Sequence, residues 1–180
     1  MKPKLSLGLS ILICLILVVF GVVYGTVSGY ADERAHVTDL LSGDNGIAAI
    51  LGYRAADALN LCVVAERHIP GDATVVALRN AAEGLRGAKP TISALQEGDG
   101  ALAAAFTATA AALKASPSFA QSARDAQYLG MLTADFDQYG SGHVIYQTYN
   151  KAVAAFDQKL STPVLGDLAR LFGVAPCQPY

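Results

Sequence analysis

The chain has 180 residues, and its 13 Lys and Arg are outnumbered by 15 Asp and Glu. Two of the cations precede the first apolar run, which leaves 11 against 15 and a net charge of −4 for the remainder. A mildly acidic chain with no basic patch is not expected to bind nucleic acid. The residues after the apolar run number about 150, the size of one ordinary domain.

The first predicted element is the uncharged run from Leu5 to Val27, LSLGLSILICLILVVFGVVYGTV. As a helix it would be roughly 34 Å long, enough to cross the hydrocarbon core of a bilayer. A single apolar segment in lipid must be helical, because every backbone polar group needs a partner there. We therefore predict a transmembrane anchor in a lipid bilayer over residues 1–28, followed by one domain over residues 29–180.

A cleavable signal peptide is the alternative interpretation of this run, with the small residues Val27 and Gly29 at its cleavage site. Signal peptides have apolar regions of only ~7–15 residues, so the length of the run favours an anchor. Lipidation at Cys14 is disfavoured, because Ile13 stands where a lipoprotein needs a small residue.

The orientation of the anchor follows from the cations that flank it. Lys2 and Lys4 precede the span, whereas Arg34 is the only cation between the span and Arg54. Because Lys and Arg are retained on the cytoplasmic side, this bias predicts a single-pass protein of the inner or plasma membrane. The domain is then expected outside the cytoplasm.

Three glycines repeat every four residues at the end of the span, at Gly21, Gly25 and Gly29. On a helix they form one stripe, and such small residues let two membrane helices approach closely. We predict self-association through this face. The alternative is that the stripe reflects the ordinary abundance of glycine in membrane helices.

The domain shows helical periodicity nearly throughout. His36 to Leu41 are expected to continue the anchor helix as far as a turn at residues 42–46. Apolar residues then step by three and four from Ile47 to Ile69, until Pro70 and Gly71 interrupt them. Asp72 is expected to cap the next helix, whose buried face is Val75, Val76, Leu78, Ala82 and Leu85.

The second half of the domain is also predicted to be helical. Residues 98–100, Gly-Asp-Gly, are expected to be a weak point of the helical pattern, and an alanine-rich helix is expected at 101–115. Ser116 and Pro117 should start one long helix that reaches residue 160 and bends at residues 140–142. Alternation of period two never persists outside the span, so the fold class is all-α.

The side chains that usually carry catalysis do not fall into a pattern. His36, His68 and His143 lack partners at metal-ligand spacing, and Asp135 and Asp137 diverge on a helix. No nucleotide, metalloprotease or hydrolase motif occurs in the sequence. We therefore expect no enzyme activity, no cofactor and no metal.

The cysteines leave one question open. Cys14 lies in the apolar run, so its simplest role is that of a small apolar side chain. A disulfide between Cys62 and Cys177 would need an oxidising compartment, and free thiols are the favoured alternative.

The chain resembles the LemA family of bacterial membrane-anchored proteins. The stretches that carry the resemblance are YRAADALNLCV at 53–63, LKASPSF at 113–119, YNKAVAAFDQKL at 149–160 and LARLFGVAPCQPY at 168–180. The positions that match the family pattern are Arg54, Asn60, Leu61, Tyr149, Asn150, Val153, Phe156, Phe172 and Gly173. The resemblance implies a bundle of long antiparallel helices behind a single anchor.

The chain also departs from the family pattern. Leu59 stands where family members have proline, and Tyr139 and Tyr146 stand where they have Glu and Arg. A polar network shared by the family is therefore not expected to be intact, and the chain resembles a divergent member.

Two functional hypotheses follow. The first is a membrane-anchored helical scaffold or adaptor of the bacterial cell envelope, which binds other membrane or envelope proteins or itself as a homo-oligomer. The second is a regulatory or sensory envelope module that acts on a partner protein. A smooth, well-packed bundle would favour the first, and a deep polar pocket the second.

Overall fold

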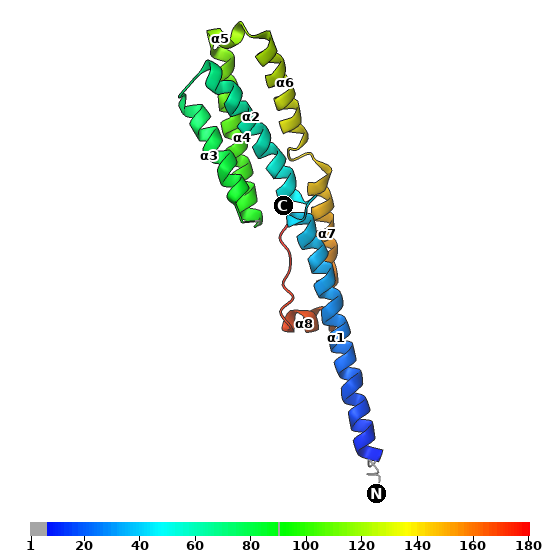
Figure 1. Cartoon of the computed structure of the whole chain (residues 1–180). Coiled ribbons are helices and arrows are strands. Elements are labelled where there is room, and N and C mark those ends of the chain that lie inside the picture. Colours follow the sequence, from blue (N-terminus) through cyan, green and yellow to red (C-terminus); the bar gives the residue numbers. More distant parts are fainter. Residues whose placement is uncertain (1–6, 90) are drawn as a thin grey trace. The chain divides into compact units, whose positions relative to one another are not determined.

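A computed structural model describes residues 7–89 and 91–180 (Figure 1). Every regular element in these two ranges is a helix, which confirms the predicted all-α class. The start of the predicted anchor, with Lys2, Lys4 and Leu5, lies outside the described residues, as does Pro90. The helices are α1 (Leu7–Ser42), α2 (Ile47–His68), α3 (Ala73–Gly87), α4 (Ile92–Ala115), α5 (Pro117–Ala120), α6 (Ala123–Gln138), α7 (Val144–Leu160) and α8 (Leu165–Leu171).

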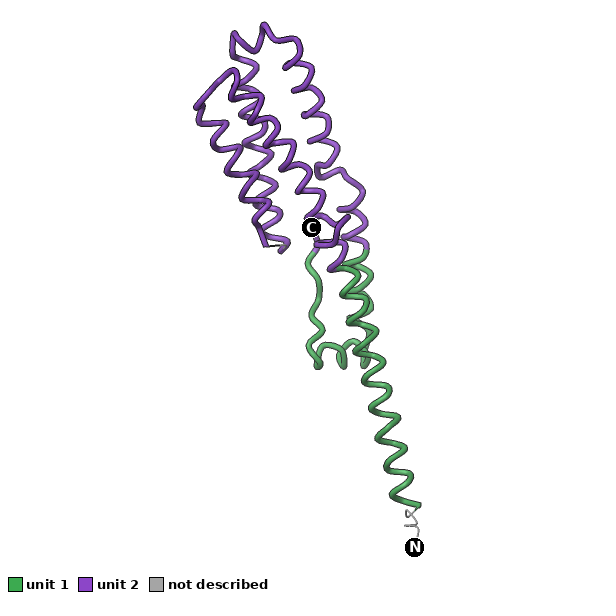
Figure 2. Tube along the Cα trace, in the orientation of Figure 1, with its two compact units in different colours: residues 1–37, 152–178 green, residues 38–151, 179–180 purple. Residues whose placement is uncertain are grey.

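The chain divides into two compact units, which Figure 2 shows in different colours. Unit 1 consists of residues 1–37 and 152–178. Unit 2 consists of residues 38–151 and 179–180. The division falls within α1 and α7, so each of these helices contributes residues to both units.

Helix α1 begins with the apolar run and continues past it, as the sequence predicts. Near its N-terminus an 18-residue window has a mean hydropathy of 2.9, and none of the window is buried. This helix is long and apolar enough to cross a membrane. It ends at the predicted turn, where the Gly43 amide donates to the Asp39 carbonyl at 2.7 Å.

The other elements of unit 1 are the end of α7, α8 and a tail without regular structure. Val153, Phe156 and Leu160 of α7 are buried, and each follows the one before it by three or four residues. Helix α8 ends at Leu171, and Gly173, two residues further on, has a φ of 90°, a left-handed conformation that glycine adopts without steric cost. The Val174 amide then donates to the Ala169 carbonyl at 3.1 Å, which satisfies an orphan helix carbonyl.

Unit 2 is organised around α2, which contacts α3, α4 and α6. Its buried residues lie on more than one side of the helix, as expected for a central element: Ile47, Ile50, Leu51, Arg54, Ala55, Ala58, Leu61, Cys62, Val64 and Ala65. The Asp72 side chain accepts a hydrogen bond from the Thr74 amide at 2.8 Å, which confirms the predicted cap of α3. Figure 1 shows α2, α3 and α4 side by side.

Two predictions about helix ends are wrong. The alanine-rich helix does not begin at residue 101, because α4 runs through residues 98–100. A Cβ atom at Gly98 would lie 2.7 Å from Cδ1 of Leu85, so this glycine lets α4 pack closely against α3. Close packing there offsets the low helix propensity of glycine.

The predicted long helix from Pro117 to Leu160 is three helices, α5, α6 and α7. Ser116 precedes α5 but makes no side-chain cap, because its hydroxyl donates to the His68 carbonyl at 3.2 Å. Ser122 caps a new helix instead, and residues 140–142 end α6 rather than bend it. There the His143 amide donates to the Gly140 carbonyl at 2.9 Å, which closes a turn.

Candidate functional site

The main buried polar group of unit 2 is Arg54, on α2. Arg54 is only 5% exposed, and its guanidinium pairs with the carboxylate of Asp99 on α4. Its Nε donates to the Phe136 carbonyl of α6 at 3.2 Å, and its Cζ lies 4.0 Å from the centre of the Phe136 ring. Arg54 therefore ties three helices together, and its charge is balanced by a carboxylate, a carbonyl and an aromatic face.

Burial lowers the pKa of the Arg54 guanidinium, whereas Tyr146, Tyr180 and Asp137 act in the opposite direction. A guanidinium remains a cation at neutral pH even so. A buried cation would be costly without partners, so the contacts of Arg54 are a condition of its burial.

Asn150 of α7 binds the main chain of Tyr180. Its Oδ1 accepts from the Tyr180 amide at 2.8 Å, and its Nδ2 donates to the Tyr180 carbonyl oxygen at 3.1 Å. The Tyr180 ring packs on Tyr146, with ring centres 4.7 Å apart and planes at 36°. We call the surface formed by Asn150 and Tyr146, which Tyr180 occupies, the Asn150 site; all three residues belong to unit 2.

The two phenols at this site stay protonated at neutral pH. Burial raises the pKa of Tyr180 to about 12, and burial also raises the pKa of Tyr146. The Tyr146 hydroxyl donates to the Tyr139 carbonyl at 3.4 Å, and the Tyr180 hydroxyl is buried beside the Tyr146 phenol. The geometry therefore suits packing and main-chain recognition, not proton transfer.

A cavity of about 400 Å³ lies beside Arg54. The Phe106 and Phe136 rings stack in its wall with centres 4.0 Å apart. The remaining lining is mostly small residues: Ala103, Thr107, Ala110, Ala111, Lys114, Thr133 and Asp137. The cavity is thus lined by aromatic rings, small residues and charged side chains, with the buried cation at one side.

The start of α6 carries a second hollow, of about 440 Å³. We call it the α6 surface, and it is formed by Arg67, Arg124, Asp125, Gln127, Tyr128 and Met131. Met131 is 56% exposed and Tyr128 is 39% exposed. Arg67 pairs with Asp125 at 2.9 Å, so one of the two arginines has its carboxylate partner within the surface.

The contact of His68 with Asp125 was not foreseen from the sequence. His68 Nε2 lies 2.8 Å from Asp125 Oδ2, and His68 Nδ1 lies 3.1 Å from the Ser118 hydroxyl. Asp125 is also the third residue of α6. The Ser122 hydroxyl accepts a hydrogen bond from the Asp125 amide and donates one to the Asp125 carboxylate. The cluster therefore joins the end of α2 to the start of α6.

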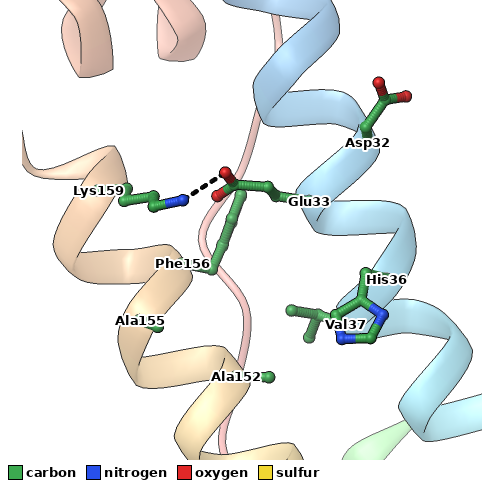
Figure 3. A pocket seen from close by; sticks show the side chains of 8 residues that line it. All are labelled: Asp32, Glu33, His36, Val37, Ala152, Ala155, Phe156 and Lys159. Atoms are coloured by element: carbon green, nitrogen blue, oxygen red, sulfur yellow. Dashed lines mark hydrogen bonds and ion pairs between the residues drawn. The ribbon is translucent and has the colours of Figure 1, made fainter.

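Unit 1 has a groove of about 480 Å³ between α1 and α7, shown in Figure 3. Lys159 and Glu33 point toward each other across it and form an ion pair, whereas Asp32 points away from Lys159. The Tyr30 hydroxyl donates to the Lys159 carbonyl at 2.9 Å. The other lining residues are His36, Val37, Ala152, Ala155 and Phe156.

The glycine stripe predicted for self-association lies on α1. A Cβ atom at Gly21, Gly25 or Gly29 would meet nothing within 4 Å. The stripe is therefore open, and no other part of the described chain packs on it.

The residues that carry the family resemblance are divided between the units. In unit 2, Arg54, Leu61 and Tyr149 are buried, Asn150 is half-buried and Asn60 is exposed. In unit 1, Val153 and Phe156 are buried, Phe172 is 55% exposed and Gly173 follows the end of α8 with a positive φ. The structure brings Arg54 and Asn150 into one neighbourhood, because Tyr180 interacts with both.

The cysteines and metal-ligand side chains add no site within the described residues. Cys14, Cys62 and Cys177 form no disulfide there. Residues 7–89 and 91–180 contain no group of three His, Cys, Asp or Glu side chains placed to hold a metal ion.

Comparison of the chain with known protein families, with characterised proteins and with solved structures finds no match in any of the three.

Proposed function

We propose that the chain is a membrane-anchored helical adaptor of the bacterial cell envelope and a divergent relative of the LemA family. The apolar part of α1 supports the anchor, and the Lys2–Lys4 bias supports a domain outside the cytoplasm. The segments around Arg54 and Asn150 support the family relationship. In this proposal the helical bundle binds other envelope proteins and performs no catalysis.

The observation that carries the proposal is the α6 surface. Tyr, Met and Arg are the residue types enriched at protein interfaces, and Tyr128, Met131 and Arg124 gather there around one hollow. Tyr and Arg also dominate the binding energy of such interfaces. An adaptor needs an exposed surface of this composition on a firmly packed scaffold.

The experiment is site-specific photo-crosslinking in intact cells. A photoreactive residue at Met131 should give a discrete crosslinked species with an envelope protein, and Arg124→Glu should abolish it. A photoreactive residue at Asn80, exposed on α3, is the matched control and should give none. Equal crosslinking from both positions, or none from Met131, would contradict the adaptor proposal.

The cavity beside Arg54 supports a second candidate, a sensory module that responds to a small ligand. Such a ligand should raise the melting temperature of the chain, and Ala111→Trp should fill the cavity and remove that rise. The Met131 crosslink should be unchanged by Ala111→Trp, so the two candidates give different results.

A further inference from the structure

The Asn150 site binds main-chain atoms of the residue that occupies it. Both hydrogen bonds of the Asn150 amide go to the N–H and the C=O of one residue, Tyr180. Any amino acid except proline offers these two groups, so this part of the contact does not depend on the bound side chain. A side-chain amide that pairs with one residue in this way imitates the edge of a neighbouring strand.

The second element of the site is Tyr146, which binds an aromatic ring. Tyr146 packs on the Tyr180 ring at 4.7 Å, a distance typical of favourable aromatic pairs. The Tyr180 hydroxyl is buried beside the Tyr146 phenol, so the two rings are packed together along with their polar ends. The site therefore fits an aromatic side chain.

The segment that occupies the site has no regular structure. Residues 174–180 are neither helix nor strand. Pro176 and Pro179 lack an amide N–H, and Gln178 precedes a proline, which favours an extended backbone. The residue that enters the site is Tyr180, which is held there by one main-chain pair and one ring; earlier in the segment, the Cys177 amide donates to Asp157 Oδ1 at 3.1 Å.

We propose that the Asn150 site is a docking site for an extended, aromatic segment of a partner protein, and that Tyr180 is its built-in occupant. The partner segment displaces Tyr180 and takes over the hydrogen bonds of Asn150. A tethered occupant competes at a high effective concentration, so the site opens only to a partner held nearby. This inference rests on the adaptor function proposed above, since it names the class of partner.

The test uses the full chain and a chain cut after Gln178, both in detergent micelles. The probe is a fluorescent peptide with the sequence of residues 174–180, Ser in place of Cys177 and an amidated C-terminus. Binding, followed by fluorescence anisotropy, should be at least about tenfold tighter to the cut chain than to the full chain. Tyr180→Ala in the full chain removes the ring but keeps the main-chain pair with Asn150, so it should give a smaller gain than the cut.

Three controls assign the binding to the Asn150 site. Asn150→Ala in the cut chain should abolish binding, whereas Lys151→Ala, an exposed neighbour, should leave it unchanged. A probe with Ala in place of Tyr180 should not bind, and one with Phe should still bind.

The proposal is overturned if the probe fails to bind both opened chains while their circular dichroism remains that of the parent. Binding that survives Asn150→Ala overturns it equally. These results are independent of the Met131 crosslink, because α6 and the Asn150 site are probed by different variants. If the Met131 crosslink is lost while the peptide probe still binds, the result contradicts the role of the α6 surface and not the Asn150 site.

Discussion

Phe156 shows how much one side chain contributes to this fold. It is 2% exposed on the buried face of α7, so replacement by alanine leaves a cavity. We expect Phe156→Ala to cost about 3–5 kcal/mol of unfolding free energy. Lys151→Ala, on the exposed face, should change stability by at most about 0.5 kcal/mol. Urea unfolding of the full chain in detergent measures both, and equal midpoints would show that Phe156 is not in the core.

Asp125 should make stability depend on pH. The hydrogen bond from His68 lowers the pKa of this carboxyl, and the Ser122 hydroxyl and the Arg67 charge act in the same direction. Its pKa in the folded chain is thus below the ordinary value of about 3.9. The carboxylate therefore contributes stability above about pH 4, and this contribution is lost as the pH falls through the folded pKa.

The variant that isolates this effect is Asp125→Asn. It should be less stable than the parent at pH 7, and the difference between the two should shrink as the pH falls below about 4. Urea titrations at a series of pH values measure the difference. A difference that stays constant down to pH 3 would mean that the ion pair is not formed.

At the scale of a helix, α4 offers a matched pair of glycines. A Cβ atom at Gly100 would meet nothing within 4 Å, whereas one at Gly98 would lie 2.7 Å from the Leu85 side chain. Gly100→Ala should therefore stabilise the chain by about 0.5–1 kcal/mol, the gain in helix propensity. Gly98→Ala must displace Leu85, so it should gain less or destabilise. Urea unfolding of the two variants checks their order.

The apolar helix α1 allows a second matched comparison of glycines. Gly21→Ile and Gly25→Ile create no clash within the chain, because both positions are open. Loss of self-association in a membrane reporter assay would then report contact between two copies of the helix. Gly8→Ile, also open but off the stripe, is the control and should leave the signal unchanged. An unchanged signal for all three variants would assign the glycines to ordinary composition.

The helices that sequence analysis located correctly are those with local end signals. Pro70, Gly71 and Asp72 act within a few residues, so the end of α2 and the cap of α3 were predictable. The glycines at residues 140–142 are compatible with either a bend in a helix or the end of one. The helix ends there because the backbone forms turn hydrogen bonds, which the apolar periodicity does not indicate. The weak point expected at residues 98–100 does not break the helix, because packing against α3 outweighs local propensity.

The candidate sites were harder to predict than the helices. Arg54 and Asn150 were marked by the family resemblance, but their partners are 45 and 30 positions away. His68 and Asp125 are 57 positions apart, and no sequence signal near either residue predicts their contact. Such pairs arise from tertiary packing, which periodicity alone does not specify.

At the scale of the whole molecule, the prediction concerns topology. A C-terminal alkaline phosphatase fusion should be active and a cytoplasmic reporter at the same position silent, because Lys2 and Lys4 retain the N-terminus inside. Replacing both lysines by glutamate should weaken or reverse this pattern. The opposite pattern in the parent chain would place the domain in the cytoplasm and exclude an envelope partner.

The reactivity of Cys62 can report how often the helical bundle opens. The thiol is buried between α2 and α3, its Sγ lies 3.7 Å from the Val75 carbonyl oxygen, and burial raises its pKa. Burial disfavours the charged thiolate, which is the form that reacts, so we expect reaction to follow an opening in which α3 moves away and water enters. The rate at which Cys62 reacts with a thiol reagent therefore counts openings of the bundle interior, in molecules that are otherwise folded.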